Sequence, residues 1–253
     1  MAPMLLHVAI YLVLGVALGY VGGLLGIGGG LIAIPMLGLF FGYSEQAAQG
    51  TALVMIVPNV LLGLWHYIRK VGLDLRLAIT LAVSAVPFTF VAARIATTLP
   101  SKPLRIAFGV FILAIAAQMA YRSLAHKKRD VEPRVLPWPF AAIVGSIGGS
   151  LSGIFSVGGA VFAVPVMSTF FGLSQVAAQG MGLALVAPGT VVSIATFAAA
   201  HDVDWLTGIA LAVGGVYSVP HGVNLAKRLP ERALRLVFAT FMLAAALGLF
   251  FRA

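Results

Sequence analysis

Long apolar runs separated by short polar connections decide what this chain can fold into. Of its 253 residues, 61% are hydrophobic and only 9% are charged, whereas a water-soluble domain carries about one quarter charged residues. Backbone groups in lipid must be hydrogen-bonded within the protein, and these runs do not alternate with polar residues, so the spanning elements are helices. The sequence predicts an all-α polytopic membrane protein with about eight to ten membrane segments. The apolar runs cover residues 4–25, 30–42, 46–67, 76–96, 104–121, 138–152, 158–171, 176–199, 205–225 and 233–251.

The charge and the cysteine count exclude several classes of function. The net charge is +9, but the basic residues lie in short connections between apolar runs, which is typical of cytoplasmic loops. No basic face with interleaved aromatic residues is present, so we expect no nucleic-acid partner. The chain has no cysteine, which excludes disulfides and thiolate metal ligands. The first apolar run lacks a basic leader and a cleavage site, and we expect it to be retained as a helix.

The two halves of the chain are copies of one unit. FFGYSEQAAQG at 40–50 matches FFGLSQVAAQG at 170–180, and LPSKPLRIAFGVFIL at 99–113 matches LPERALRLVFATFML at 229–243. The same offset of 130 residues aligns most of each half without a gap, which indicates an internal repeat. We expect both copies to pack into one integrated transport domain. Its parts are a first membrane repeat at 1–121, a polar cytoplasmic linker at 122–137 and a second membrane repeat at 138–253.

Each repeat contains a glycine-rich break near its start. The sequences are GLLGIGGGLIAIP at 23–35 and GIFSVGGAVFAVP at 153–165, and a short apolar run follows each break. A full membrane span needs about 20 residues, so the short runs predict a helical hairpin whose tip stops inside the bilayer. Each repeat is then a glycine-tipped hairpin plus three transmembrane helices.

This arrangement gives each repeat an odd number of crossings, so the second repeat is inverted relative to the first. Twelve of the 16 lysines and arginines then lie on one side of the membrane, which satisfies the positive-inside rule. The linker at 122–137 is predicted to be cytoplasmic and both chain ends to lie outside. Two parallel repeats of four spans each are the alternative. The four basic residues on the other side are Arg94, Lys102, Arg105 and Arg252.

The apolar segments offer little to a catalyst. No metal-binding motif, carboxylate pair or Ser-His-Asp arrangement can be assembled within them, so we expect neither an enzyme nor a cofactor or metal site. Glu45, Asp74, Asp202 and Asp204 all fall at segment ends. Proton relays in membranes use carboxylates inside the bilayer, and these four lie at its edges, so the sequence does not identify a relay. Whether a proton is the coupling ion is left open.

Neutral groups can nevertheless bind an anion. A helix N-terminus presents free backbone N–H groups and a partial positive charge, and glycines allow a ligand to approach the backbone closely. The two glycine-rich breaks start short helices, and we expect an anion site between their tips. Close helix packing is the alternative role of these glycines.

Polar side chains near the breaks extend the candidate site. The glutamines of the repeated AAQG motif are neutral donors for an oxyanion, or form a helix–helix hydrogen bond. Polar residues after Pro58 and Pro188 either line the path or bind carbonyls that proline frees. Tyr217, His221 and Asn224 share one helix face, and whether this stripe faces the pore stays open. The candidate substrate-binding residues are Gly26, Gly28, Gly29, Gly30, Gln49, Asn59, Ser156, Gly158, Gly159, Gln179, Thr190 and Ser193.

The glycine-rich motif before a proline, its copy in the second half and the S-x-x-x-A-x-G pattern at 44–50 and 174–180 resemble the sulfite exporter TauE/SafE family. The resemblance implies a multi-pass permease of the inner (plasma) membrane that exports sulfite, organosulfonates or related sulfur-containing anions. Such a secondary transporter would work by alternating access around a midplane site. An anion channel, an uptake permease for another small organic anion and a non-transporting scaffold are the alternatives. The sequence is also compatible with a homo-oligomer.

Overall fold

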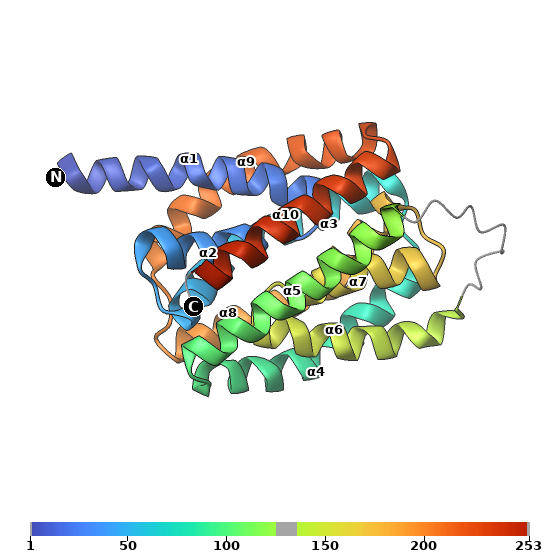
Figure 1. The fold of residues 1–253 in the computed structure, drawn as a ribbon, viewed down its shortest axis with the longest axis horizontal. Coiled ribbons are helices and arrows are strands. Elements are labelled where there is room, and N and C mark those ends of the chain that lie inside the picture. The colour runs from blue at the N-terminus through green and yellow to red at the C-terminus, as the bar shows by residue number, and fades with distance from the viewer. Residues whose placement is uncertain (1, 125–135, 252–253) are drawn as a thin grey trace.

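The computed structural model describes residues 2–124 and 136–251, and these residues contain helices but no strand. The predicted all-α class is therefore confirmed for the described part of the chain (Figure 1). The first repeat forms α1 (Ala2–Leu25), α2 (Gly30–Phe41), α3 (Glu45–Val71), α4 (Leu75–Thr98) and α5 (Ser101–Leu124). A short 3-10 turn (Trp138–Phe140) precedes α6 (Ala141–Phe155), α7 (Gly158–Phe170), α8 (Gln175–Ala199), α9 (Trp205–Arg228) and α10 (Glu231–Phe251).

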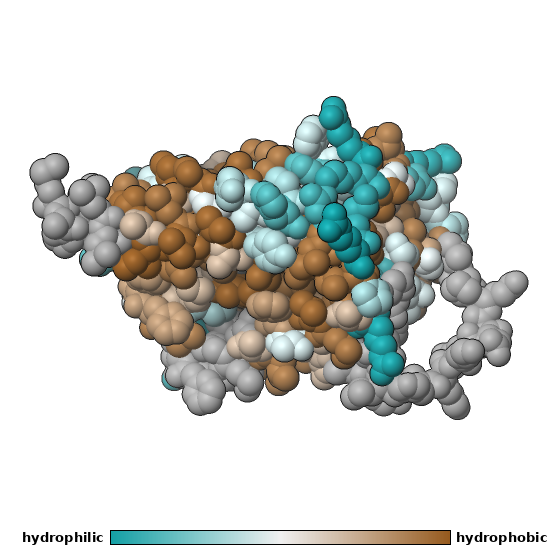
Figure 2. Space-filling model, turned by 90° about the horizontal axis from the view of Figure 1, so that it is seen from above, coloured by the Kyte–Doolittle hydropathy of each residue, from teal (hydrophilic) through white to brown (hydrophobic). Residues whose placement is uncertain are grey.

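Among the described residues, six helices are long and apolar enough to cross a membrane, namely α1, α3, α4, α8, α9 and α6 with its preceding turn. The second helix of each repeat is short, with 12 residues in α2 and 13 in α7. The chain is thus a multi-pass membrane protein, and the short second leg expected in each repeat is present. Large apolar side chains cover much of the outer surface (Figure 2), as a lipid environment requires.

The two repeats are interwoven, because the first helix of each packs along the fourth helix of the other. Glycines at every fourth position make this possible, since they let two backbones approach closely. A Cβ atom added to Gly15 would lie 2.2 Å from the Leu211 carbonyl oxygen, and one added to Gly149 would lie 2.4 Å from that of Ala85. The glycines are Gly15, Gly19 and Gly23 of α1 against α9, and Gly145, Gly149 and Gly153 of α6 against α4.

These contacts also fix the helix directions. Along α1 the partners on α9 advance in step, so α1 and α9 are parallel, and α6 and α4 are parallel in the same way. α3 is parallel to α9, because Thr51 contacts Asp204 near the start of both helices and Lys70 contacts Asn224 near their ends. α1, α3 and α9 therefore run in one direction, and α4, α6 and α8 run in the other (Figure 1).

The repeated S-x-x-x-A-x-G motif has a structural explanation at the start of α3 and α8. Ser44 and Ser174 are the N-caps, and their hydroxyls accept from the amides of Ala47 and Ala177 at 3.1 and 3.2 Å. Such a cap satisfies one of the free amides of the first turn. Gly50 permits close contact with the connection before α9, since a Cβ atom there would lie 2.1 Å from the Asp202 carbonyl oxygen.

Candidate functional site

Two hairpin tips form the centre of the candidate site. The first tip, residues 26–29, joins α1 to α2, and three of its glycines have positive φ angles between 67° and 89°. The second tip, residues 156–157, joins α6 to α7, and Ser156 adopts φ 59° there. A non-glycine residue in this region costs roughly 1–2 kcal/mol, so Ser156 holds a strained position. Neither N-cap, Gly29 or Val157, supplies a side-chain acceptor to the short helix that follows.

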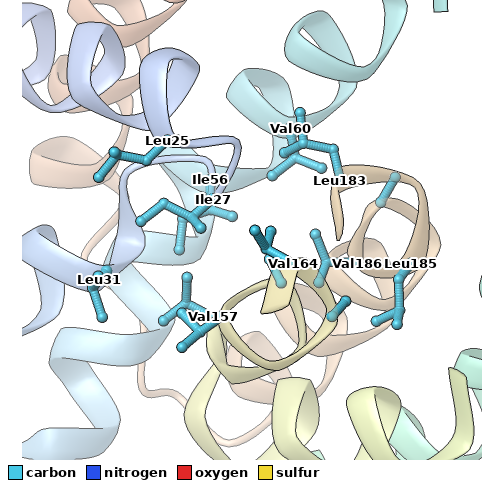
Figure 3. Packing of buried hydrophobic residues seen from close by; sticks show 14 of the residues in the cluster. Leu25, Ile27, Leu31, Ile56, Val60, Val157, Val164, Leu183, Leu185 and Val186 are labelled. Atoms are coloured by element: carbon cyan, nitrogen blue, oxygen red, sulfur yellow. The ribbon is translucent and has the colours of Figure 1, made fainter. Parts of the chain in front are cut away.

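The tips touch each other through apolar groups. A Cβ atom added to Gly30 would lie 3.4 Å from Val157 Cβ, and Ile27 and Val157 are both buried. In Figure 3, Ile27, Ile56 and Val157 gather between the two hairpins. Apolar side chains thus fill the space between the tips in this conformation, and the shared anion site expected there stays a prediction.

Each tip instead meets a glutamine on the third helix of the other repeat. Gly26 lies against Gln179 of α8, since a Cβ atom added to Gly26 would be 2.5 Å from Gln179 Cβ. Ser156 Oγ donates to Gln49 Oε1 of α3 at 3.2 Å. Both glutamines have no exposed surface. The structure thus brings the repeated glutamines to the tips and makes two separate tip–glutamine clusters.

The two glutamines differ in their hydrogen bonds. Gln49 uses both ends of its amide, because Oε1 accepts from Ser156 and Nε2 donates to Glu45 Oε1 at 3.3 Å. Gln179 Oε1 accepts from the Tyr67 hydroxyl at 3.0 Å, while its Nε2 is buried with no hydrogen-bond partner in the described part of the chain. Leaving a buried donor unpaired costs about 1–3 kcal/mol, so an acceptor supplied by a ligand would be stabilised there.

Tyr67 is a residue that sequence reasoning missed. Its side chain is fully buried, and its hydroxyl oxygen lies 3.0 Å from Gln179 Oε1 and 3.1 Å from the Gly23 carbonyl oxygen, so its one hydrogen is shared between these two acceptors. The hydroxyl fixes the Gln179 carbonyl, which leaves the amide nitrogen as the free end. Phe197 occupies the equivalent position in the second repeat, so the tyrosine–phenylalanine difference between the copies was the available signal.

Glu45 is also more central than its place in the sequence suggested. We expected it at a segment end, but it has no exposed surface and bonds to Gln49. The signal that was overlooked is its position in the repeated motif, one turn before the glutamine. Within residues 2–124 and 136–251, no three His, Cys, Asp or Glu side chains form a group that could hold a metal ion.

The polar residues after the prolines divide into two groups. Asn59 is buried beside the first tip, with Nδ2 3.5 Å from the Gly28 carbonyl and Oδ1 unpaired within the described residues. Thr190 donates to the Ala187 carbonyl of its own helix at 2.9 Å, and Ser193 is buried further along α8. They lie about 16 and 21 Å along the helix axis from Gln179 at the usual rise per residue, so neither joins its cluster.

The other candidate glycines, which lie in the first tip and in the first turns of α2 and α7, serve close packing. A Cβ atom added to them would approach apolar side chains or backbone oxygens, whereas at Gly26 it would meet a polar candidate residue. The packing alternative is therefore supported for five glycines. The distances are 2.5 Å to Val60 Cγ2 for Gly28, 2.7 Å to the Leu18 oxygen for Gly29, 2.5 Å to Ile56 Cδ1 for Gly30, 2.7 Å to the Leu151 oxygen for Gly158 and 2.4 Å to the Gly148 oxygen for Gly159.

The polar stripe of α9 lies on the outside of the molecule. Tyr217 is 71% exposed, and His221 and Asn224 are exposed as well. His221 Nδ1 lies 3.2 Å from the Tyr217 carbonyl, which is a local contact within α9. The question left open by the sequence is therefore answered: the stripe faces outward and not toward the centre of the molecule.

A polar cluster closes one end of the molecule. The Tyr43 hydroxyl, between α2 and α3, donates to Asp204 Oδ2, and the Thr207 hydroxyl donates to the same atom at 2.9 Å. Burial, together with the hydrogen bond to Asp204, raises the pKa of Tyr43 to about 12. For Asp204, burial acts to raise the pKa, but the hydrogen bonds from Tyr43, Thr207 and backbone amides outweigh it and lower the pKa. The cluster ties the exit of the first hairpin to the second repeat.

Comparison with known proteins agrees with this architecture. A probable membrane transporter protein of Methanocaldococcus jannaschii is 24% identical over 260 residues, covering 97% of this chain and 96% of its own length. One from Xylella fastidiosa is 27% identical over 244 residues, covering 94% and 93%. The family model described as Sulfite exporter TauE/SafE matches residues 11–249. With nearly its whole length matched, the chain belongs to the sulfite exporter TauE/SafE family of membrane transporters.

Proposed function

We propose that this protein exports small sulfur-containing anions, such as sulfite or organosulfonates, across the cell inner membrane. The observation that carries the proposal is the buried Gln179 Nε2, which has no partner in the described part of the chain and lies beside the first tip. A buried, unpaired amide beside the tip that precedes the short helix α2 suits an anion, because the amide and a helix N-terminus both favour negative charge.

The chemistry of the cluster suits a sulfonate or sulfite group. Such a group has several acceptor oxygens, and the donors near the first tip are neutral, namely Gln179 Nε2, Asn59 Nδ2 and the first amides of α2. Neutral donors replace the water of the anion without holding it as an ion pair would. A transporter needs this balance, since it must release its substrate as well as bind it.

The mechanism that we propose is alternating access between inverted repeats. In support, α1 and α3 run opposite to their counterparts α6 and α8, and each tip meets the other repeat. Rocking one repeat against the other would separate the tips and expose Gln179. The apolar contact between Gly30 and Val157 favours a carrier over an anion channel, because a channel needs a continuous path when open.

The test is flux into proteoliposomes that contain the purified protein. We expect saturable uptake of sulfite, taurine or sulfoacetate, with acetate as the anion that lacks the third oxygen and protein-free liposomes as the control. Preloading with unlabelled anion should accelerate exchange if the protein is a carrier. A current that never saturates would instead establish a channel, and folded protein without flux for any sulfur anion would contradict the proposal.

A further inference from the structure

A basic pocket lies on the outer surface where α3 and α9 end. It has a volume of about 570 Å³ and is lined by Lys70, Asn224, Lys227 and Arg228. A second pocket of about 360 Å³ shares two of these residues and adds Tyr20, His221 and Leu225. Figure 2 shows a hydrophilic band crossing the otherwise apolar surface on this side of the molecule. The lining residues of the two pockets therefore form one continuous surface.

The pocket is organised for an oxyanion. Three of its four lining residues are cations, and no carboxylate is among the lining residues of either pocket. Lys70 Nζ donates to Asn224 Oδ1, which orients the Asn224 amide nitrogen as a further donor. Basic residues at helix ends also compensate the helix dipole, but that role does not require them to gather around one cavity with an amide.

The second copy of the fold lacks this chemistry. The positions equivalent to Lys70, Asn224, Lys227 and Arg228 are Ala200, Arg94, Thr97 and Thr98. The first three of these line a pocket of about 560 Å³ that is otherwise mostly apolar, with Arg94 as its one charged lining residue. The cavity thus follows from the fold, whereas the three cations are present in only one of its two copies.

We propose that the basic pocket binds a phosphate-type oxyanion, which the membrane supplies as the headgroup of an anionic phospholipid. Lys70 is the penultimate residue of α3, and Lys227 and Arg228 end α9, so the pocket lies at the level of the lipid headgroups. Leu225 and the Tyr20 ring in the adjoining pocket offer apolar surface to the rest of the lipid. Basic pockets between helices on the cytoplasmic side are typical binding sites for anionic headgroups.

The test uses Trp65 of α3 as a reporter. Trp65 is exposed and lies about one helical turn before Lys70, and the Arg69 guanidinium lies 4.4 Å from its ring. The full chain with Trp138→Phe and Trp205→Phe is placed in phosphatidylcholine bilayers that contain brominated phosphatidylglycerol. We expect saturable quenching with about a hundredfold preference over brominated phosphatidylcholine, since each of the three cations contributes roughly fivefold. Lys70→Gln with Lys227→Gln and Arg228→Gln should remove this preference, whereas Arg94→Gln should keep it.

Inorganic phosphate and sulfate distinguish the two sources of the oxyanion. If quenching by brominated phosphatidylglycerol persists in millimolar phosphate, the lipid headgroup is supported as the source. If brominated phosphatidylglycerol and brominated phosphatidylcholine quench equally while free phosphate binds saturably, the lipid headgroup is overturned as the source. If the protein neither prefers brominated phosphatidylglycerol nor binds free phosphate saturably, the site itself is overturned. If the triple variant loses its thermal unfolding transition, the single variants Lys227→Gln and Arg228→Gln take its place, with a partial loss expected from each.

Discussion

The two hairpin tips share one fold but differ in the partner of the glutamine that each tip meets. At the second tip, Gln49 is held at both ends by Ser156 and Glu45. At the first tip, Tyr67 holds the carbonyl of Gln179 and leaves the amide nitrogen unpaired among the described residues. Three replacements between the copies account for the difference, since Gly26, Glu45 and Tyr67 correspond to Ser156, Gln175 and Phe197.

The difference shows how a duplicated fold becomes asymmetric. The helix pairing, the N-caps and the close glycine contacts are kept in both copies because they hold the bundle together. The polar groups at the tips take no part in the close glycine contacts of α1 with α9 and of α6 with α4, and they differ between the copies. We expect the first tip to bind the substrate and the second to be mainly structural.

The largest expected effect comes from the two glutamines. Gln179→Leu removes the free donor and should lower kcat/KM for sulfite flux about 100-fold, as the loss of a hydrogen bond to a charged group predicts. Gln49→Leu should lower it only about fivefold, because the Gln49 amide is bonded to Ser156 and Glu45 at its two ends and offers no free donor to the substrate. Initial rates in proteoliposomes measure both losses. Equal losses would contradict the assignment of substrate binding to the first tip.

Gly26→Ala should have the next largest effect, on stability. Gly26 has φ 67°, and the new Cβ would lie 2.5 Å from Gln179 Cβ, so we expect a loss of about 1–3 kcal/mol. Ser156→Gly at the equivalent position relieves strain but removes a hydrogen bond, and the net change should stay within about 1 kcal/mol. Denaturant unfolding in detergent measures the difference, and a greater loss at Ser156 would reverse the assignment.

Tyr67→Phe tests whether the tyrosine positions Gln179. The variant matches Phe197 of the other repeat and should raise KM for sulfite about fivefold, since one hydrogen bond is worth roughly 1 kcal/mol. The maximal rate should change less, because the donor itself remains. Tyr43→Phe, which removes a hydroxyl that bonds to Asp204 and not to Gln179, serves as the control. An unchanged KM with intact folding would show that Tyr67 is only a packing residue.

The smallest effect concerns the Tyr43–Asp204 cluster, which the second repeat lacks because Leu173 replaces the tyrosine. The pKa of Tyr43 rises from 10.0 to about 12 in the folded protein, so its contribution to stability is complete below pH 10 and is lost as the pH rises to about 12. The Tm of the wild type should therefore fall more steeply across this range than that of Tyr43→Phe. If the Tm of both proteins falls equally between pH 10 and about 12, the stabilising role of the Tyr43 hydroxyl is contradicted.

Much of the architecture was predictable from the sequence. The apolar runs specified the helices, the repeat specified five of them per half, and the glycine breaks specified the two hairpins with short second legs. The glutamines could be selected because the AAQG motif occurs twice. Glu45 and Tyr67 were not selected, since a carboxylate at a segment end and a tyrosine in an apolar run carry no sign of burial; only their positions in the aligned repeats marked them.

The sequence by itself determined that this chain is a duplicated helical membrane protein, because hydrophobicity, repeat spacing and glycine placement are local properties. Only the tertiary structure decided that each tip meets the glutamine of the other repeat and that apolar side chains fill the space between the tips. It also decided that the polar face of α9 points outward. These outcomes depend on the exchange of helices between repeats, which brings together residues more than one hundred positions apart.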